Sequence, residues 1–303
     1  MTQTGNNTSS SRTPSSEYST IGRTTLNTEI ETDRREFSTL YAEVAGPIGH
    51  LVLNRPASLN AINDAMLADL TEAVRWIDSH RELRVVIFKG HGSGFCAGAD
   101  LNSLPFAQGR PETGNSWLYR REVGQIGTRL CEAIEQMHAV TIAQVHGCAV
   151  GGGVLFMIAC DLRVVAEGTV MFIPEVDLGT PYSWGAVPRM VREIGPALTK
   201  ELIITCRRFT PEEAREWRWI NRVTSLDTLE KEVEQLASEI AQKPSVPVVI
   251  TKDHVNAVAR VMGAGLTSYA DGDLALAMGV EEESLAAARK YAHSKMSKDR
   301  PRR

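Results

Sequence analysis

Two glycine-rich segments are the parts of this 303-residue sequence whose residue types and placement suggest chemistry. HGSGFCAGADL follows the apolar run VVIFKG, and HGCAVGGGVLF follows VTIAQV. A glycine-rich turn between a strand and a helix presents backbone N–H groups that have no partner within the helix. Two such turns side by side would hold one oxyanion between them. Either segment taken alone is more simply a tight turn, since neither contains a dinucleotide or phosphate-loop motif.

The elements around these segments predict an α/β core. STLYAEVAG and IGHLVLNRP are two short strands separated by glycine and proline, which is a hairpin signal. Apolar residues recur at helical spacing from Asn63, and a second helix is expected over about residues 123–137. Strands and helices that alternate in this way pack parallel strands under crossover helices. DLRVVAEG is expected to be a further strand, and VMFIPEVDL a further extended segment.

Three regions are expected along the chain. Residues 1–36 are rich in Ser, Thr and Asn and lack an apolar run, which predicts a disordered N-terminal tail. Residues 37–224 form the α/β core with the candidate site. Residues 225–303 show helical spacing with few strand signals and are expected to form a C-terminal helical region.

Four segments taken in order carry a resemblance to a known family: NRPASLNAI, GFCAGADL, GCAVGGGVLFMIACD and FIPEVDLG. Over about residues 39–223 the sequence resembles the crotonase, or enoyl-CoA hydratase/isomerase, superfamily. The resemblance implies a spiral of ββα units with a C-terminal α-helical trimerisation region, and a homotrimer or homohexamer. It also implies an acyl-CoA thioester substrate, with coenzyme A as part of the substrate and no separate cofactor.

The same resemblance assigns three catalytic groups. The backbone N–H groups of Ala99 and Gly152 would form the oxyanion hole, and Glu175 would move the proton. Gly152 stands where an apolar helix is expected to begin, so its amide would lack a helical partner. The apolar neighbours of Glu175 should raise the pKa of its carboxyl towards the working range of a general base.

Further residues are candidates for substrate binding. By the resemblance, Ser58 and Leu59 lie in the loop that contacts CoA, and Ala97, Asp100 and Leu101 flank the path of the adenine and pantetheine. The other candidates are Leu155, Ser183 and Trp184. For Asp100 a structural role in a turn is the favoured interpretation, because Asp is a common turn residue. Ser183 and Trp184 can shape an acyl pocket, although packing is the commoner role of such residues.

One departure from the family separates two reactions. Hydratases of the family use two glutamates, and Leu155 stands where the resemblance places the first. A positioned acid or base contributes about 10²–10⁴-fold to a rate, so its loss favours enoyl-CoA isomerisation with Glu175 as the sole base. Asp177 and Glu122 are other acids, but Asp177 in an extended segment would lie about 7 Å further along. A dienoyl-CoA isomerase is disfavoured, because Ser183 stands where that enzyme has an aspartate.

Two other functions stay open. An enoyl-CoA hydratase (a hydro-lyase) of fatty-acid or related acyl-CoA catabolism would manage with one carboxylate or borrow another. A non-catalytic acyl-CoA-binding member of the family is the alternative from a different class, and the glutamate kept in an apolar motif argues against it.

Composition excludes several other classes. The formal net charge of -4, with both signs mixed along the chain, gives no basic face for a nucleic acid. Five cysteines without a CxxC pair and seven scattered histidines predict reduced thiols and no metal. The apolar stretch 139–160 is interrupted by polar residues and by three glycines, so no membrane association is expected. Acidic residues in the tail argue against a transit peptide and favour the cytoplasm.

Overall fold

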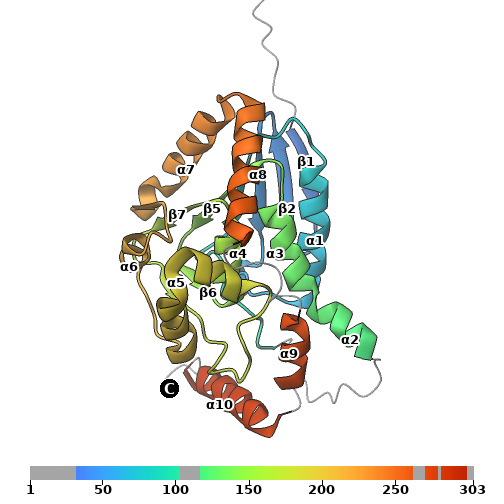
Figure 1. Cartoon of the computed structure of the whole chain (residues 1–303), viewed down its shortest axis with the longest axis vertical. Helices are drawn as coiled ribbons and strands as arrows, with labels where there is room; N and C mark the ends of the chain where they lie inside the picture. The colour runs from blue at the N-terminus through green and yellow to red at the C-terminus, as the bar shows by residue number, and fades with distance from the viewer. Residues whose placement is uncertain (1–31, 103–116, 262–269, 279–280, 299–303) are drawn as a thin grey trace, which may run out of the picture. The chain divides into compact units, whose positions relative to one another are not determined.

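The computed structural model describes residues 32–102, 117–261, 270–278 and 281–298, and its centre is a seven-stranded sheet in the order β1-β2-β3-β4-β5-β7-β9 (Figure 1). The first three strands pair antiparallel and the others parallel. The strands are β1 (Thr32–Glu36), β2 (Leu40–Ala45), β3 (Ile48–Leu53), β4 (Val85–Gly90), β5 (Val140–Val145), β7 (Leu162–Ala166) and β9 (Arg222–Thr224). A second, two-stranded parallel sheet joins β6 (Cys148–Val150) and β8 (Val170–Phe172). The predicted α/β class and the hairpin of β2 and β3 are confirmed.

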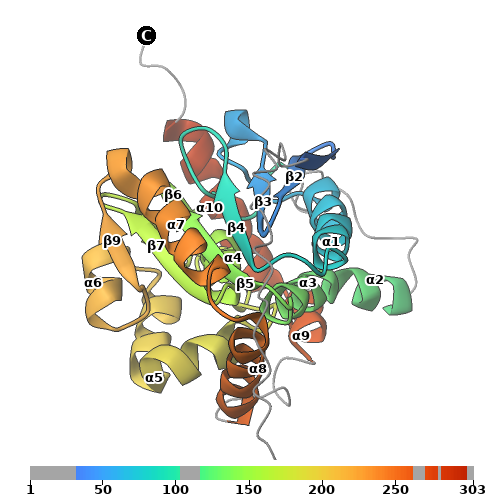
Figure 2. The same cartoon turned by 90° about the horizontal axis from the view of Figure 1, so that it is seen from above.

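Helices cover both faces of the large sheet. They are α1 (Asp64–Asp78), α2 (Trp117–Gly124), α3 (Ile126–Glu135), α4 (Gly152–Ala159), α5 (Ala186–Thr205), α6 (Pro211–Glu216), α7 (Leu226–Ala241), α8 (Ser245–Val261), α9 (Asp271–Met278) and α10 (Glu282–Lys298). Apolar side chains of α1, α3 and α4 form the main core with one face of the sheet. Helix α7 covers the other face, beside β4, β5 and β7 (Figure 2). The first helix of the expected C-terminal region is therefore part of the core.

The N-terminal boundary differs from the prediction. The expected tail ran to residue 36, but Thr32–Glu36 is a strand that pairs with β2 along its whole length. This edge strand is polar and exposed, so it lacks the apolar alternation that marks a half-buried strand. Arg34 holds it to β2 through an ion pair with Glu43 at 3.1 Å. The rest of the expected tail, residues 1–31, lies outside the described residues.

The segment around Glu175 also differs from the prediction. An extended run was expected over 170–178, but β8 ends at Phe172 and residues 175–179 form a turn. The N–H of Thr180 donates to the backbone oxygen of Glu175 at 2.9 Å, which closes the turn. Asp177 is consequently exposed, while Glu175 is largely buried.

Two further observations concern helices. The single helix expected over residues 123–137 is divided into α2 and α3 at Gln125, whose backbone is the N-cap of α3.

Within the described ranges, no helix combines the length and the apolar character needed to cross a membrane.

Candidate active site

The two glycine-rich segments lie side by side, because each follows one of two neighbouring parallel strands, β4 and β5. Cys96 joins them: its N–H donates to the oxygen of Cys148 at 3.0 Å, and its oxygen accepts from the N–H of Val150 at 3.0 Å. A β-carbon at Gly98, where φ is +80°, would lie 2.5 Å from the oxygen of Val150. The same point is 3.7 Å from the nitrogen of Gly152. Only glycine permits this close approach of the two loops.

Two backbone amides at this contact have no protein partner within the described residues. Ala99 pairs with Ile62 in an isolated parallel bridge. The hydrogen bonds of the bridge come from the neighbours of Ala99: the N–H of Ile62 donates to the oxygen of Gly98, and the N–H of Asp100 donates to the oxygen of Ile62. The N–H of Ala99 therefore points away from Ile62. Gly152 is the first residue of α4, so its N–H has no helical acceptor. Two unpaired donors near each other, one at the positive end of a helix dipole, can bind the oxygen of a polarised carbonyl.

Glu175 lies against the start of α4. A β-carbon at Gly151 would meet the Oε1 atom of Glu175 well within 3.0 Å, so the carboxylate rests on the glycine backbone. Its Oε2 atom is buried and has no hydrogen-bond partner in the described part of the chain. Burial raises the pKa of Glu175 to about 8, because an apolar site disfavours the charged form. A carboxyl with this pKa can accept and return a proton near neutral pH.

A third loop, NRPASLN, supports the first glycine-rich loop. The buried side chain of Asn60 accepts from the N–H of Arg55 at 2.8 Å and donates to the oxygens of His91 and Gly94, at 3.0 and 2.8 Å. Asp100 forms an ion pair with Arg55 at 2.9 Å. The ion pair thus connects this loop to the first glycine-rich loop, and the Oδ1 atom of Asp100 also accepts from the N–H of Asn102 at 3.2 Å.

The other candidates for CoA binding lie on the same two loops. Ser58 ends the short 3-10 helix Pro56–Ser58, and its hydroxyl donates to the oxygen of Arg55 at 3.1 Å. Leu59 has left-handed backbone, its side chain is 40% exposed, and its oxygen accepts from the N–H of Ala97 at 2.9 Å. Leu101 is half-buried, and the described part of this loop ends at Asn102.

Trp184 and Ile62 flank the Gly152 amide. A β-carbon at Gly152 would lie 2.7 Å from Cδ1 of Ile62 and 3.4 Å from Cζ3 of Trp184. The Trp184 indole also stacks on Phe156 of α4, with ring centroids 6.4 Å apart. Ser183, beside it, is half-buried and lines a small cavity of about 220 Å³ with Tyr182. Trp184 and Ile62 thus border the backbone of the residue that carries this amide.

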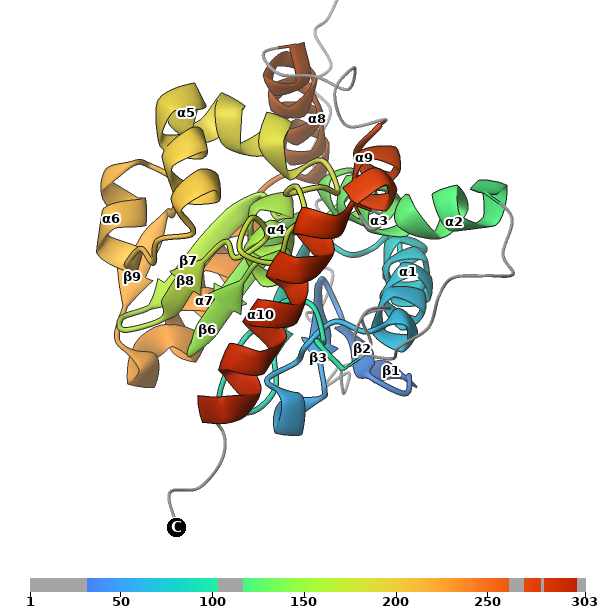
Figure 3. The same ribbon diagram turned by 90° about the horizontal axis from the view of Figure 1, so that it is seen from below.

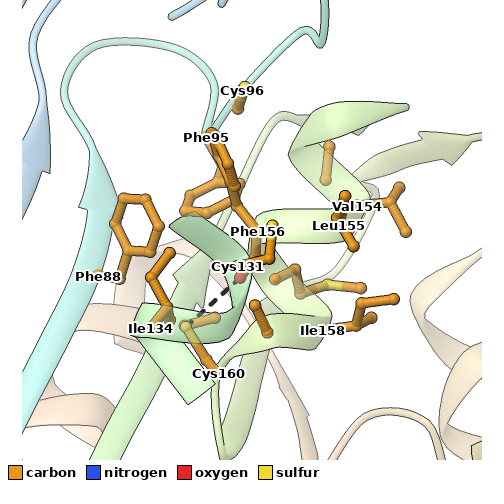
Figure 4. Close-up of a cluster of buried hydrophobic side chains, with 14 of the residues drawn as sticks. Phe88, Phe95, Cys96, Cys131, Ile134, Val154, Leu155, Phe156, Ile158 and Cys160 are labelled. Carbon is orange, nitrogen blue, oxygen red and sulfur yellow. Dashed lines mark hydrogen bonds between the residues drawn. The ribbon is translucent and has the colours of Figure 1, made fainter. Parts of the chain in front are cut away.

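Leu155 is one helical turn after Gly151 and is 1% exposed. All residues of α4 are buried, and Leu155 belongs to the main core with Val154 and Phe156 (Figure 4). The position where the family resemblance places a second glutamate therefore carries an apolar side chain in apolar surroundings.

Helix α10 packs against the turn that carries Glu175. A β-carbon at Gly179 would clash with the backbone of Ser284, so these two segments touch (Figure 3). Helix α9 reaches the residue after Trp184, because Asp271 accepts a hydrogen bond from the N–H of Gly185 at 2.8 Å. The C-terminal helices thus support both sides of the candidate site.

Comparisons with known proteins show the family to which this chain belongs. The family model described as enoyl-CoA hydratase/isomerase matches residues 43–292. A peroxisomal Delta(3,5)-Delta(2,4)-dienoyl-CoA isomerase of Arabidopsis thaliana is 34% identical over 209 residues, covering 67% of this chain and 75% of the relative. A crotonyl-CoA hydratase of Syntrophomonas wolfei is 32% identical over 207 residues, covering 68% and 76%. The crystal structure of a probable enoyl-CoA hydratase from Mycobacterium smegmatis has a TM-score of 0.72 and 26% identity, over 82% of this chain and 98% of that one. The chain therefore belongs to the enoyl-CoA hydratase/isomerase, or crotonase, family and has its fold.

Several residues at the site were not found from the sequence. Ile62 stands inside a quoted motif, but nothing in the motif places its side chain on Gly152. Arg55 and Asp100 are far apart in the chain, and their ion pair carries no local signal. Asp271 lies in the C-terminal region that was expected to be helical, but no individual helix was predicted over Asp271–Met278. For Gly151 a signal existed: the first glycine of a triplet before a helix commonly takes a backbone conformation that other residues avoid.

Proposed function

We propose that this protein is an enoyl-CoA isomerase that shifts a double bond from the 3- to the 2-position of an acyl-CoA thioester, with Glu175 as the only acid–base group. The observation that carries the proposal is the position of the Glu175 carboxyl at the start of α4, near two amides that have no partner in the described part of the chain, with a leucine at the second carboxylate position.

The proposed reaction follows from these groups. The thioester oxygen of a 3-enoyl-CoA accepts hydrogen bonds from the N–H groups of Ala99 and Gly152. Glu175 removes a proton from C2, and the electron pair spreads into a dienolate whose oxygen the two amides stabilise. The protonated Glu175 then returns the proton at C4, which gives the conjugated 2-enoyl thioester and restores the carboxylate. Both steps use groups of the chain itself, so no cofactor besides the CoA of the substrate is required.

The surroundings of Glu175 support an isomerase over a hydratase. Hydration of a conjugated enoyl thioester adds water across the double bond, which the family achieves with two carboxylates. The two alternative acids, Asp177 and Glu122, are both exposed, so neither shares the buried environment of Glu175. A hydratase lacking one acid–base group would lose about 10²–10⁴-fold in rate, or about 3–5 kcal/mol of barrier.

The names of two relatives correspond to alternative reactions. The Syntrophomonas wolfei relative is named a hydratase and the Arabidopsis thaliana relative a dienoyl-CoA isomerase. We propose that neither name transfers: Leu155 disfavours hydration, and Ser183 stands where the dienoyl-CoA isomerases of the family have an aspartate. A non-catalytic acyl-CoA binder is the remaining alternative. A carboxyl with a pKa of about 8 in a largely buried site is more typical of a working base.

The test compares rates on 3-hexenoyl-CoA and crotonyl-CoA for the protein, for Glu175→Gln and for Asp177→Asn. Asp177 is the matched control, because it is a carboxylate two residues away on the same turn but exposed. We expect conversion of 3-hexenoyl-CoA that is lost in Glu175→Gln and kept in Asp177→Asn. Faster hydration of crotonyl-CoA would instead indicate a hydratase, and tight binding without turnover of either thioester would indicate a binder.

We further propose a homotrimer, or a hexamer of two trimers, as the family resemblance implies. Apolar residues on α8 support it, because Val246, Ile250, Val255, Val258 and Val261 are 54–84% exposed, and all of them but Val255 fall on about a third of the helix circumference. Ile250→Glu should lower the mass measured by light scattering, whereas Leu226→Glu, at an equally exposed residue on α7, should not. A monomeric parent protein would contradict the proposal.

A cytoplasmic location stays a prediction. The Arabidopsis thaliana relative is named peroxisomal, and a relative from Dictyostelium discoideum is named mitochondrial. Fluorescence imaging of the tagged full-length chain would separate these locations.

A further inference from the structure

Tyr182 makes a hydrogen bond at the start of α4 that the reaction proposed above does not use. Its side chain is 4% exposed, and its hydroxyl donates to the backbone oxygen of Gly151 at 2.9 Å. The same oxygen accepts from the N–H of Leu155 at 3.1 Å, which is the first hydrogen bond of the helix. Both lone pairs of the Gly151 oxygen are therefore occupied.

The oxygen of Gly151 and the N–H of Gly152 belong to one peptide unit. The described residues contain no cis peptide bond, so this unit is trans and its C=O and N–H point in opposite directions. Two donors that hold the oxygen fix the orientation of the whole plane, and with it the direction of the N–H. Donation to a carbonyl oxygen also polarises the peptide, which strengthens its N–H as a donor.

We propose that Tyr182 is a positioning residue that orients and strengthens the Gly152 N–H as a donor to the thioester oxygen. The inference rests on the proposed function, because it assumes that this amide binds the oxygen of an acyl-CoA. In this role the Tyr182 hydroxyl does not touch the substrate and acts on it through the peptide unit of Gly151 and Gly152.

The surroundings of Tyr182 keep its hydroxyl in the donor form. Burial raises the pKa of Tyr182 well above its usual value, and the nearby Glu175 carboxylate raises it further. The hydroxyl therefore stays protonated throughout the pH range in which Glu175 titrates.

The chain connection gives the hydrogen bond a second consequence. Tyr182 follows the turn 175–179, so one short segment carries the base and also holds the peptide that includes the Gly152 amide. The hydrogen bond thereby links the segment that carries the proposed base to the start of α4.

The test uses Tyr182→Phe, with Tyr41→Phe as the matched control. Tyr41 lies on β2, where its ring lies under the Arg34 guanidinium, and β3 separates this strand from β4, which the first glycine-rich loop follows. Infrared difference spectra are recorded with hexanoyl-CoA labelled with ¹³C at the thioester carbonyl, a saturated thioester that cannot isomerise. Turnover is measured with 3-hexenoyl-CoA.

In the parent protein and in Tyr41→Phe, we expect the thioester band to move to lower frequency on binding. Tyr182→Phe should reduce that displacement and lower kcat by about 5- to 50-fold, with KM changed less than threefold. The loss should be smaller than the 10²–10³-fold typical when an oxyanion donor is removed outright, because the amide itself stays. Where Tyr182→Phe does not fold, 3-fluorotyrosine at position 182, a more acidic donor, should increase the displacement.

Two results would overturn the inference. The first is a displacement of the thioester band in Tyr182→Phe that equals the displacement in the parent protein. This result would overturn the inference even if kcat fell, because a purely structural role of Tyr182 would leave the carbonyl unaffected. A parent protein that binds hexanoyl-CoA without any displacement of the band would refute the oxyanion hole itself. The failure of the proposed function is thus distinct from the failure of the role of Tyr182.

Discussion

The α-carbon of Gly151 faces the carboxylate of Glu175, so closely that any side chain at position 151 would occupy the space of Oε1. The backbone of Gly151 also takes φ 50° and ψ -111°, which lies outside the left-handed helical region that non-glycine residues occasionally adopt. Position 151 therefore requires glycine for two independent reasons: its conformation and the approach of the proposed base.

These two reasons can be separated experimentally with Gly151→Ala and Gly168→Ala. Gly168 also has positive φ, at 72°, but a β-carbon there would meet nothing within 4 Å. We expect Gly168→Ala to cost about 1–2 kcal/mol of unfolding free energy from backbone strain alone and to keep full turnover. Gly151→Ala should cost more and reduce turnover of 3-hexenoyl-CoA by at least about 10²-fold, because Glu175 is displaced. Urea unfolding and steady-state rates measure both, and equal turnover in the two variants would contradict the role of this contact.

The activity should rise with pH through the pKa of Glu175. The proposed base works in its ionised form, and burial raises its pKa to about 8. The value of kcat/KM should therefore increase about tenfold per pH unit below that pKa and level off above it. A profile of kcat/KM from pH 5 to pH 10 measures this. A rate that is flat between pH 5 and pH 8 would show that no group with a raised pKa limits the reaction.

The same pKa predicts how the stability of the protein depends on pH. The pKa of Glu175 in the folded protein, about 8, lies above the ordinary value of 4.5. Above about pH 4.5 the carboxyl is ionised in the unfolded chain, whereas the folded chain must either keep the proton or bury the charge. Both cost free energy of folding. The cost is absent below about pH 4.5, grows between pH 4.5 and pH 8, and is complete above pH 8. Glu175→Gln removes it, so the variant should be more stable than the parent by about 4 kcal/mol at pH 8 and nearly equal at pH 4. Denaturant unfolding of both proteins at the two pH values checks the sign, and a variant that is less stable at pH 8 would refute the burial of an unsatisfied carboxyl.

Local patterns predicted much of the fold and the main chain of the site. The hairpin of β2 and β3, the helix that starts after Asn63, and the two glycine-rich loops all follow from short stretches of sequence, because turn residues and apolar spacing act over a few positions. The side chain of Asn63 accepts from the N–H of Met66 at 2.9 Å, as expected of a residue that begins a helix.

The parts that could not be predicted depend on contacts between distant residues. Strand β1 is polar on both faces and exists because the edge of β2 offers backbone partners. Helix α5 is interrupted by a kink at Gly195 and Pro196, which breaks the periodicity that would have marked it. The contact of Trp184 with Gly152 joins segments more than thirty residues apart, so its placement at the amide depends on the whole core.

Leu155→Glu should move the protein towards hydration, because it restores a carboxylate where the family hydratases have one. The matched control is Leu155→Gln, which has nearly the same size and polarity but cannot transfer a proton. Leu155 is 1% exposed, so both variants should lose stability from burying a polar group in the core. Only Leu155→Glu should raise the rate of crotonyl-CoA hydration, by about 10²-fold, since one positioned acid–base group contributes that much. Rates on crotonyl-CoA and 3-hexenoyl-CoA, with unfolding curves for each variant, measure the change in preference. If both variants hydrate equally, the polarity of position 155 matters and its acid–base chemistry does not, and the argument that Leu155 selects isomerisation fails.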